Sequence, residues 1–352
     1  MSDVFIRVDA SQAIGTGHAY RRLSLADVLV ANGIGATFAI RRMDGDLCAY
    51  IAERGHAVTI VGTTDPTDRT WLGVSPEREI GEMRALVGRL PTRPRWIVVD
   101  HYAIDARWER AMRDLEMRVL AIDDLGRSHA ADYVLDATLG LPTRYAKTSN
   151  GDPHVLSGPR FAFVRETFVA ARRVERTRDG SIARILVFYG GVDTSGETLK
   201  AVRALRSIVA SVTVDVVCGE RSAWRAAVET AAKADTRLRV WGNREDMAHL
   251  MASADLALGA GGTATWERCY VGLPTIATSI APNQDAVVSE LAAAGALVSL
   301  GCAGDIGERD VADRIEQLLT DPVLVRRLAA RATDVVQGWE EARSELLVIF
   351  HS

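Results

Sequence analysis

The chain has 352 residues, of which 48% are hydrophobic and 25% charged, and its formal net charge is −4. This length predicts two domains of roughly 150 residues or more, each with its own core. The charge gives no electrostatic footprint for nucleic acid or an anionic membrane surface, and no apolar run approaches the ~20 residues of a membrane span.

The N-terminus and the cysteines favour a cytoplasmic protein. The opening residues MSDVFIRVDA contain no basic region followed by a long apolar run, so we expect no signal peptide. The four cysteines are widely scattered and form no CxxC pattern, which is typical of a reducing compartment.

Short apolar runs alternate with helical patterns through the first half of the chain. Strands are predicted at Val4–Val8, Ala36–Ile40, Ala57–Val61, Trp96–Val99, Val119–Ile122 and Tyr133–Leu135, and helices at His18–Ala31, Asp46–Glu53, Pro76–Leu90 and Asp105–Leu115. A polar stretch over 142–159 and a charged run over 171–180 predict a domain junction. We therefore place an N-terminal domain at residues 1–165.

A second series of the same kind predicts a C-terminal domain at residues 182–335. Its strands are predicted at Arg184–Phe188, Val212–Val217, Leu238–Trp241, Leu256–Leu258, Thr275–Ala277 and Leu297–Leu300, and its helices at Thr194–Ala210, Ala223–Ala234, Arg244–Ala252, Thr263–Val271, Gln284–Ala293 and Asp310–Thr320. The tail is helical with a break near Gly338, which leaves a last helix over 336–352. The rhythm predicts an α/β fold of two Rossmann-like domains facing across a cleft, the GT-B arrangement, with the ligand in the cleft. By analogy with that fold, the last helix crosses back to the first domain.

A glycine loop follows the first strand, which ends at Asp9. Gly15, Thr16 and Gly17 precede His18 at the start of a helix, where free N–H groups favour an anion. The helix dipole disfavours a charged imidazole there, so a neutral His18 is suited to act as a general base. The alternative is an imidazole that only hydrogen-bonds the loop. The loop lacks both the third glycine of GxGxxG and the lysine of a Walker A motif.

Polar residues also follow another strand of the first half. Asp100 and Tyr102 belong to a triplet that ends the run WIVVD, and such strand ends face the ligand site of open α/β sheets. A loop cap is the alternative. The triplet Asp44–Gly45–Asp46 resembles a DxD metal signature, but it stands at a helix start, so we favour an N-cap and predict no metal site.

The second half carries two glycine turns and one amide pair. Gly190 and Gly191 follow the run ILVFY and suit either a phosphate contact or a plain turn. A second group of candidates for ligand binding comprises Gly261, Gly262, the N-cap Thr263, Thr265, Glu267, Asn283 and Gln284. Glu267 suits ribose hydroxyls or a favourable charge at the helix start, and the amides suit sugar hydroxyls or a helix cap.

Six motifs occur in the order IGTGHAYR, VVDHYAID, LSGPRFAFVRETF, GGVD, GAGGTATWERCYVGLP and NQD. As an ordered set, from Ile6 to at least Asp285, they resemble the UDP-2,4-diacetamido-2,4,6-trideoxy-β-L-altropyranose hydrolases of pseudaminic acid biosynthesis. The resemblance implies a GT-B fold and water as the acceptor. It also implies a small-molecule UDP-sugar substrate, no metal and no cofactor. For partners we expect no nucleic acid, no membrane, and a monomer or weak homo-oligomer.

The resemblance implies roles for individual residues. His18 matches the essential histidine, Asp9 the strand-end aspartate that orients it or binds substrate, and Tyr102 the tyrosine of the DHY motif. Arg21 and Asp100 lie in the same motifs and are expected to contact substrate. The glycine turn and glutamate of the nucleotide-binding helix match Gly261, Gly262 and Glu267, and the asparagine of the NQ pair matches Asn283.

Departures from the family pattern bear on the sugar more than on the reaction. Ala137 and Thr138 follow Asp136 where Gln–Asn is typical, Tyr189 replaces a smaller residue, and Pro282 precedes Asn283. Two other readings stay open: a glycosyltransferase with the same donor, and a non-enzymatic nucleotide-sugar sensor.

Overall fold

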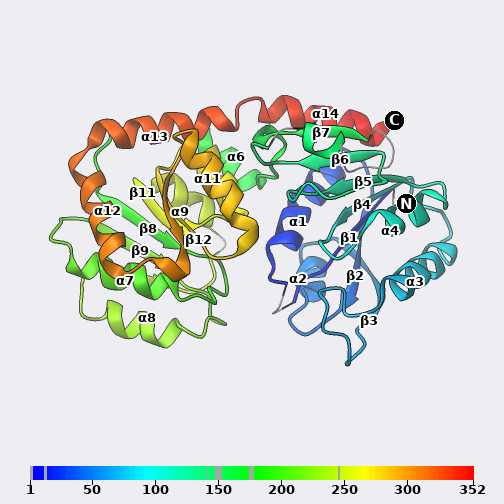
Figure 1. Cartoon of the computed structure of the whole chain (residues 1–352), viewed down its shortest axis with the longest axis horizontal. Coiled ribbons are helices and arrows are strands. Elements are labelled where there is room, and N and C mark those ends of the chain that lie inside the picture. The colour runs from blue at the N-terminus through cyan, green and yellow to red at the C-terminus, as the bar shows by residue number, and fades with distance from the viewer. Residues whose placement is uncertain (1–2, 12–13, 141, 147–152, 174–177, 245) are drawn as a thin grey trace. The chain divides into compact units, whose positions relative to one another are not determined.

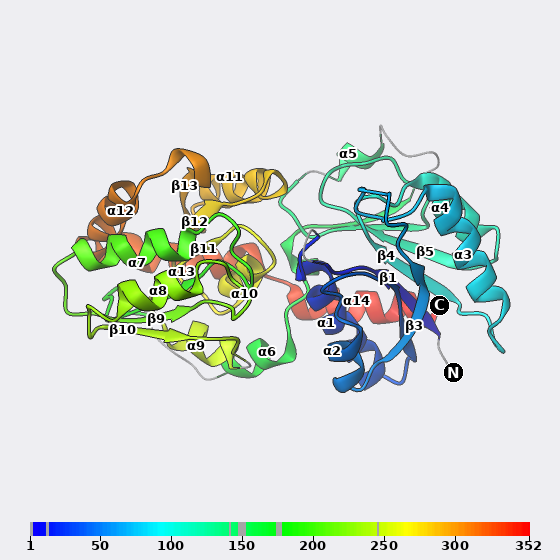
Figure 2. The ribbon, with the colours of Figure 1, turned by 90° about the horizontal axis from the view of Figure 1, so that it is seen from below.

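The computed structural model describes residues 3–11, 14–140, 142–146, 153–173, 178–244 and 246–352. The chain divides into two compact units (Figure 1). Unit 1 comprises Met1–Phe163 and Gly338–Ser352, and unit 2 comprises Val164–Gln337. Each unit is built on one parallel sheet with helices on both faces (Figure 2).

Unit 1 contains a seven-stranded sheet in the order β3-β2-β1-β4-β5-β6-β7, with every pair parallel. Its strands are β1 (Val4–Val8), β2 (Ala36–Arg42), β3 (Ala57–Thr63), β4 (Trp96–Asp100), β5 (Arg118–Ile122), β6 (Tyr133–Asp136) and β7 (His154–Ser157). The strand order reverses between β1 and β4, where Val8 lies beside Asp100. Strand β7 lies in the polar stretch that the sequence analysis assigned to the domain junction, and it pairs with β6 at the sheet edge.

Alternating side chains of β1 build the two cores of unit 1. Val4, Ile6 and Val8 join the cluster that includes helix α1, whereas Phe5 joins the opposite cluster. The first face carries α1 (Gly17–Ala31), α2 (Cys48–Glu53) and α14 (Trp339–His351), and the second carries α3 (Pro76–Gly88) and α4 (Ala106–Arg113). Two short helices complete the unit, α5 (Thr143–Ala146) and η1 (Pro159–Phe161).

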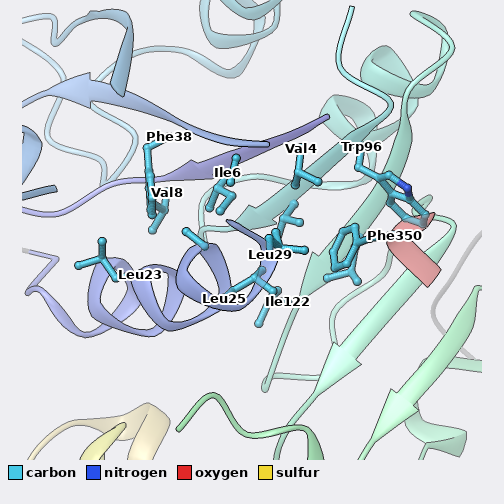
Figure 3. Close-up of a cluster of buried hydrophobic side chains, with 14 of the residues drawn as sticks. Val4, Ile6, Val8, Leu23, Leu25, Leu29, Phe38, Trp96, Ile122 and Phe350 are labelled. Atoms are coloured by element: carbon cyan, nitrogen blue, oxygen red, sulfur yellow. The ribbon is translucent and has the colours of Figure 1, made fainter. Parts of the chain in front are cut away.

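Helix α14 packs into the core of unit 1. Its apolar residues Ala342, Leu346 and Phe350 are buried there, and the Phe350 ring lies 5.1 Å from Trp96 in an edge-to-face arrangement (Figure 3). The indole N–H of Trp339 donates to the carbonyl of Ala162 at 2.7 Å. The last residues of the chain therefore complete a core that the first residues begin.

Unit 2 contains a six-stranded parallel sheet in the order β10-β9-β8-β11-β12-β13. Its strands are β8 (Arg184–Phe188), β9 (Thr213–Val217), β10 (Leu238–Trp241), β11 (Leu256–Ala260), β12 (Thr275–Ser279) and β13 (Val298–Cys302). Its helices are α6 (Glu166–Arg172), α7 (Glu197–Ser207), α8 (Arg225–Ala232), α9 (Met247–Ser253), α10 (Ala264–Tyr270), η2 (Pro282–Gln284), α11 (Asp285–Ala293), η3 (Ala303–Asp305), α12 (Glu308–Thr320) and α13 (Pro322–Val335). The order again reverses between its first and fourth strands, β8 and β11.

Helix α7 begins three residues later than the sequence pattern indicates. The sequence pattern predicts a helix from Thr194, but Asp193 and Gly196 have φ values of 46° and 75° and keep the chain in a turn. The Asp193 carboxylate then accepts hydrogen bonds from the N–H groups of Glu197 and Thr198 at 3.1 and 2.8 Å. Asp193 is therefore the group that caps this helix.

Among the described residues, no helix combines the length and apolar character needed to cross a bilayer. Parts of the predicted junction, at 147–152 and 174–177, lie outside the described residues, as does residue 245 in the predicted helix Arg244–Ala252.

Replacing Phe350 by Ala is expected to lower the free energy of unfolding of unit 1 by about 3–5 kcal/mol, because the cavity opens against Trp96. Denaturant unfolding measures this change. Val348→Ala on the same helix is the matched control, because Val348 is 69% exposed and its loss is expected to cost less than about 0.5 kcal/mol. Equal effects of the two substitutions would contradict the packing of α14.

Candidate functional site

The topology places the predicted site residues at the carboxyl ends of the strands where the order reverses. Asp9 follows β1 and Asp100 ends β4 in unit 1, while Gly190 follows β8 and Gly261 follows β11 in unit 2. In open α/β sheets, this edge is where ligands bind. Each unit therefore presents its own cluster of candidate residues.

The loop before His18 is a closed turn. The N–H of Gly15 donates to the Ser11 carbonyl at 2.9 Å, and the N–H of Ile14 donates to the Ser11 hydroxyl at 3.1 Å. Gly15 has a φ of 80°, a conformation that favours glycine. Thr16 is the N-cap of α1 and makes no side-chain cap bond. Gln12 and Ala13 of this loop lie outside the described residues.

His18 is the second residue of α1, and its partner is Asp100. The imidazole Nδ1 lies 2.7 Å from Oδ1 of Asp100, and the His18 residue is 9% exposed. Nη2 of Arg21 also lies 2.9 Å from Nδ1, so a carboxylate, which only accepts, and a guanidinium, which only donates, both face this nitrogen. In the tautomer that donates from Nδ1 to Asp100, the other ring nitrogen, Nε2, is the one that can accept a proton.

The Asp100 carboxylate is held ionised by surrounding cations. Burial alone would raise its pKa, but Arg21, His18 and Arg22 together hold the pKa well below its usual range. Nη2 of Arg21 lies 3.5 Å from Oδ1, and Nε of Arg22 lies 3.1 Å from Oδ2. The Arg22 guanidinium also packs over the Phe163 ring at 4.0 Å, and burial lowers its pKa to about 9.

The expectation that Asp9 orients His18 is wrong. The Asp9 carboxylate is buried and accepts from Nη1 and Nη2 of Arg7 at 2.5 and 2.8 Å and from the Arg41 N–H at 2.8 Å. Nε2 of His101 lies 3.5 Å from it. The physical reason is that Arg7 on β1 lies two residues before Asp9, so its side chain points to the same side of the sheet and donates to both carboxylate oxygens. Asp9 is part of a buried ion network rather than a partner of the imidazole.

Tyr102 stands against the His18 ring. Their centroids are 4.9 Å apart with the planes nearly perpendicular. The Tyr102 hydroxyl donates to Oδ1 of Asp124 at 2.7 Å, and Arg21 lies 3.9 Å from the other oxygen of Asp124. His18, Arg21, Asp100 and Tyr102, which the sequence analysis selected separately, therefore lie together.

A buried histidine that the sequence analysis did not select supports the Tyr102 segment. Nδ1 of His129 lies 2.7 Å from Oε1 of Glu109, and its Nε2 lies 3.6 Å from Oδ2 of Asp123. Arg127 pairs with Asp123 at 2.5 Å and donates to the Tyr102 carbonyl at 2.8 Å. No short motif marks His129, because its two partners are far from it in sequence or on another element.

In unit 2, some residues of the glycine turn after β11 hold the turn together, and others have free backbone N–H groups among the described residues. The Thr265 hydroxyl is buried, donates to the Ala260 carbonyl at 3.1 Å and accepts from Arg268 at 2.9 Å. Its N–H donates to Gly262, so Thr265 builds the turn and is not directed at a ligand, which corrects the expectation. Arg268, which the sequence analysis did not select, is fully buried beneath this turn.

The N–H groups of Gly262, Thr263 and Ala264 have no hydrogen-bond partner among the residues that the structure describes. Thr263 is the N-cap of α10 but makes no side-chain cap bond. By contrast, the N–H of Gly261 donates to Oε1 of Gln284 at 3.1 Å. Three adjacent backbone N–H groups at the carboxyl end of β11 can donate hydrogen bonds to an anion.

The amide pair after β12 has two different environments. Oε1 of Gln284 accepts from the N–H groups of Gly261 and Ile280, so this side chain braces the turn instead of contacting sugar. Asn283 is exposed on η2. Of the two amides, Asn283 stays the candidate for a ligand.

Glu267 is paired with an arginine that the sequence analysis quoted but did not select. Both carboxylate oxygens of Glu267 accept from Arg165, at 2.6 and 2.9 Å, and Glu267 is 5% exposed. Arg165 lies in the motif LSGPRFAFVRETF, so the sequence contained a motif that could have marked it as a candidate site residue. The bidentate pair fixes the direction of the carboxylate.

The turn after β8 is shaped by close backbone packing. Gly190 has a φ of 97°. The Gly191 carbonyl oxygen lies so close to Gly219 that a Cβ atom on Gly219 would be only 2.0 Å from it. Asp193 accepts from the first N–H groups of α7, so this helix start is not an open anion site. The phosphate contact expected here is therefore limited to the Gly190–Gly191 turn.

No cluster of three or more His, Cys, Asp or Glu side chains with a metal-binding arrangement occurs among the described residues. Asp46 of the DxD-like triplet accepts from the Cys48 N–H at 3.0 Å, at the start of α2.

Comparisons with known proteins give distant relatives. No family model matches the chain. It is 23% identical over 282 residues to the uncharacterised protein MJ1062 of Methanocaldococcus jannaschii, a match that covers 78% of this chain and 54% of that protein. It is 25% identical over 190 residues to the spore coat polysaccharide biosynthesis protein SpsG of Bacillus subtilis, covering 53% and 56%. The matches thus span about half the length of these curated relatives.

Similar folds occur among solved structures. The MurG protein of Acinetobacter baumannii superposes with a TM-score of 0.70 at 15% identity, covering 100% of this chain and 99% of that one. The spinosyn rhamnosyltransferase SpnG, complexed with thymidine diphosphate, gives 0.70 at 17% identity, covering 99% and 100%. Together with the two Rossmann-like parallel sheets, these likenesses show that the chain has the two-domain α/β fold known as GT-B.

Asp9→Asn and Asp100→Asn are expected to separate folding from the chemistry of His18. Asp9→Asn removes one of the two carboxylates that pair with buried Arg7, the other being Glu79 at 2.7 Å, and should lower the free energy of unfolding by up to about 3–5 kcal/mol. Asp100→Asn should instead release the Nδ1–H tautomer of His18, because an amide can donate as well as accept. Denaturant unfolding and nitrogen NMR of the imidazole measure the two effects. A tautomer change in the Asp9 variant, with none in the Asp100 variant, would restore Asp9 as the orienting group.

The His129 network is expected to lose stability in alkali. Burial would lower the pKa of His129, but Asp123 and Glu109 raise it to about 9. A raised pKa adds stability that is fully present below the unfolded value of ~6.5 and is lost as the pH rises through about 9. The gap in unfolding free energy between wild type and His129→Gln should therefore narrow above that pH. A gap independent of pH would show that His129 is not charged in the fold.

Proposed function

We propose that this protein hydrolyses a UDP-sugar, with the donor UDP-2,4-diacetamido-2,4,6-trideoxy-β-L-altropyranose as the first candidate substrate. The observation that carries the proposal is the His18–Asp100 pair, 2.7 Å apart at the carboxyl edge of the sheet in unit 1. The motif resemblance gives the substrate, and the GT-B fold is compatible with a nucleotide-sugar donor.

In the proposed reaction, water attacks the anomeric carbon and the bond from that carbon to the diphosphate oxygen breaks. UDP leaves with the electron pair, and the sugar inverts its anomeric configuration. Nε2 of His18 takes the proton of the attacking water, and ionised Asp100 stabilises the imidazolium that forms. Tyr102 and Arg21, which contact His18, are proposed to hold the sugar.

In the proposed scheme, unit 2 binds the nucleotide. The N–H groups of Gly262, Thr263 and Ala264 are proposed to donate hydrogen bonds to the diphosphate, together with the N–H groups of Gly190 and Gly191. Preorganised donors of this kind are worth about 3–4 kcal/mol each when charge develops on the leaving group. Glu267, directed by Arg165, is proposed to accept the ribose hydroxyls, and Asn283 to contact the sugar. The scheme needs no metal.

A glycosyltransferase is the second candidate, because SpnG, which shares the fold, is a rhamnosyltransferase. The same imidazole could take a proton from an acceptor hydroxyl instead of water. In that case UDP release without acceptor would be slow and an acceptor would accelerate it.

The hydrolase is tested by UDP release from the diacetamido-trideoxy-altrose donor with EDTA present and no acceptor, beside UDP-N-acetylglucosamine. Fast release from the first donor only is expected. His18→Asn should reduce turnover roughly 10²–10⁴-fold, because it removes the general base. In water labelled with heavy oxygen, the label should enter the sugar, and its appearance in UDP would mean that phosphorus was attacked.

His56→Asn is the matched control. His56 is also buried and paired with an aspartate, Asp27 at 2.7 Å, but it precedes β3 at the opposite edge of the sheet. Its replacement should leave turnover nearly unchanged. Equal losses in the two variants would remove His18 from the role of base, and binding without any release would favour a sensor.

A further inference from the structure

Trp71 is a large aromatic side chain left in solvent by a loop that is anchored in the core. The loop joins β3 to α3, and Leu72 and Val74 are 2% and 1% exposed in the apolar cluster beneath it. Trp71 precedes Leu72 and is 41% exposed. Trp71 belongs to none of the six sequence motifs and takes no part in the reaction proposed for His18.

The loop that carries Trp71 is held by its own hydrogen bonds. The N–H of Asp65 donates to the Gly73 carbonyl at 2.7 Å, which closes the loop at its base. Asp65 and Asp68 each accept from the N–H and hydroxyl of the threonine two residues later, at 2.6–2.8 Å. Gly73 has a φ of 67°, and a Cβ there would lie 2.5 Å from Thr64. Trp71 is thus presented on a preorganised support, which lowers the entropic cost of binding.

Three rings lie in a row from this loop to the imidazole. Trp71 stacks on Tyr102 with centroids 5.7 Å apart and planes at 30°, and Tyr102 meets His18 edge to face at 4.9 Å. Tyr102 is fixed through its hydroxyl on Asp124. The exposed indole of Trp71 therefore contacts Tyr102, and Tyr102 contacts His18, the proposed base.

The chemistry of this position suits an acylated deoxysugar. Tryptophan has a large apolar body with one N–H donor, and the Trp71 indole N–H has no hydrogen-bond partner in the part of the chain that the structure describes. A pyranose with a methyl at carbon 6 and an acetamido group offers apolar C–H surface and a carbonyl acceptor side by side. Asp124, which accepts from the Tyr102 hydroxyl, is also paired with Arg21, so a neutral ligand group fits best beside Tyr102.

We propose that Trp71 binds the sugar of the donor, with its indole against the apolar face and methyl groups of the pyranose and its N–H toward an acetamido carbonyl. This inference rests on the proposed function and adds the residue that selects the sugar. Trp71 makes no contact with UDP in this scheme and takes no part in proton transfer.

The test measures binding separately from turnover. In a His18→Asn background, the dissociation constants of the diacetamido-trideoxy-altrose donor and of free UDP are measured by calorimetry for Trp71, Trp71→Phe and Trp71→Ala. Trp71→Ala is expected to weaken the donor roughly 10-fold or more, the range for a lost apolar contact, and to leave UDP unchanged. Trp71→Phe keeps a ring but not the N–H, so it should fall between the other two.

Ile60→Ala is the matched control, because Ile60 on β3 is also 41% exposed in the same unit. It should change neither constant. In the His18-intact enzyme, Trp71→Ala should raise KM and change kcat little, since His18 and Asp100 keep their contact.

A donor constant in Trp71→Ala equal to that of the Ile60 control would overturn the inference, as would an equal weakening of UDP. Failure of the proposed function looks different: the wild type would bind the donor and release no UDP, while the donor constants would still respond to Trp71. The Trp71→Phe variant guards against a folding defect, because it preserves the stack on Tyr102.

Discussion

The polar chemistry of unit 1 depends on the buried carboxylate of Asp100. Three cationic or potentially cationic groups, Arg21, Arg22 and His18, converge on it from the first turns of α1. The carboxylate stays ionised because these partners outweigh the cost of its burial. One ion cluster therefore does two things. It attaches the start of α1 to the neighbouring strand β4, and it holds the His18 imidazole by its Nδ1 between Asp100 and Arg21.

In unit 2, the side chains near the turn after β11 support the backbone instead of pointing out of it. Arg268 and Thr265 bond to each other and to the Ala260 carbonyl, and Gln284 braces Gly261 from the other side. Backbone N–H groups are then the donors left over. Such a turn suits the charge and shape of a phosphate, which supports the proposed binding of the diphosphate there.

The sequence predicted the alternation of strands and helices because each buried strand is a short apolar run bounded by turn residues. It offered Asp9 and not Asp100 as the residue that orients His18, because both are aspartates at adjacent strand ends and the pairing of Asp9 with Arg7 becomes evident only in the structure. Strand β7 was missed because an edge strand of four residues needs little apolar surface. The capping role of Asp193 depends on a positive φ that no pattern announces.

The proposed hydrolase and the alternative glycosyltransferase differ in their acceptor, but both reactions require that a hydroxyl lose a proton. In the proposed reaction, Nε2 of His18 takes a proton from the hydroxyl that lies next to it, whether this belongs to water or to a sugar. The His18–Asp100 pair is therefore compatible with both proposed reactions and does not distinguish their acceptors. The space beside the imidazole separates the two proposals: Tyr102 meets the His18 ring edge to face there, and Trp71 stacks on Tyr102 one ring further out. In the proposed scheme, the sugar of the donor covers this aromatic surface and water is the nucleophile that reaches the imidazole.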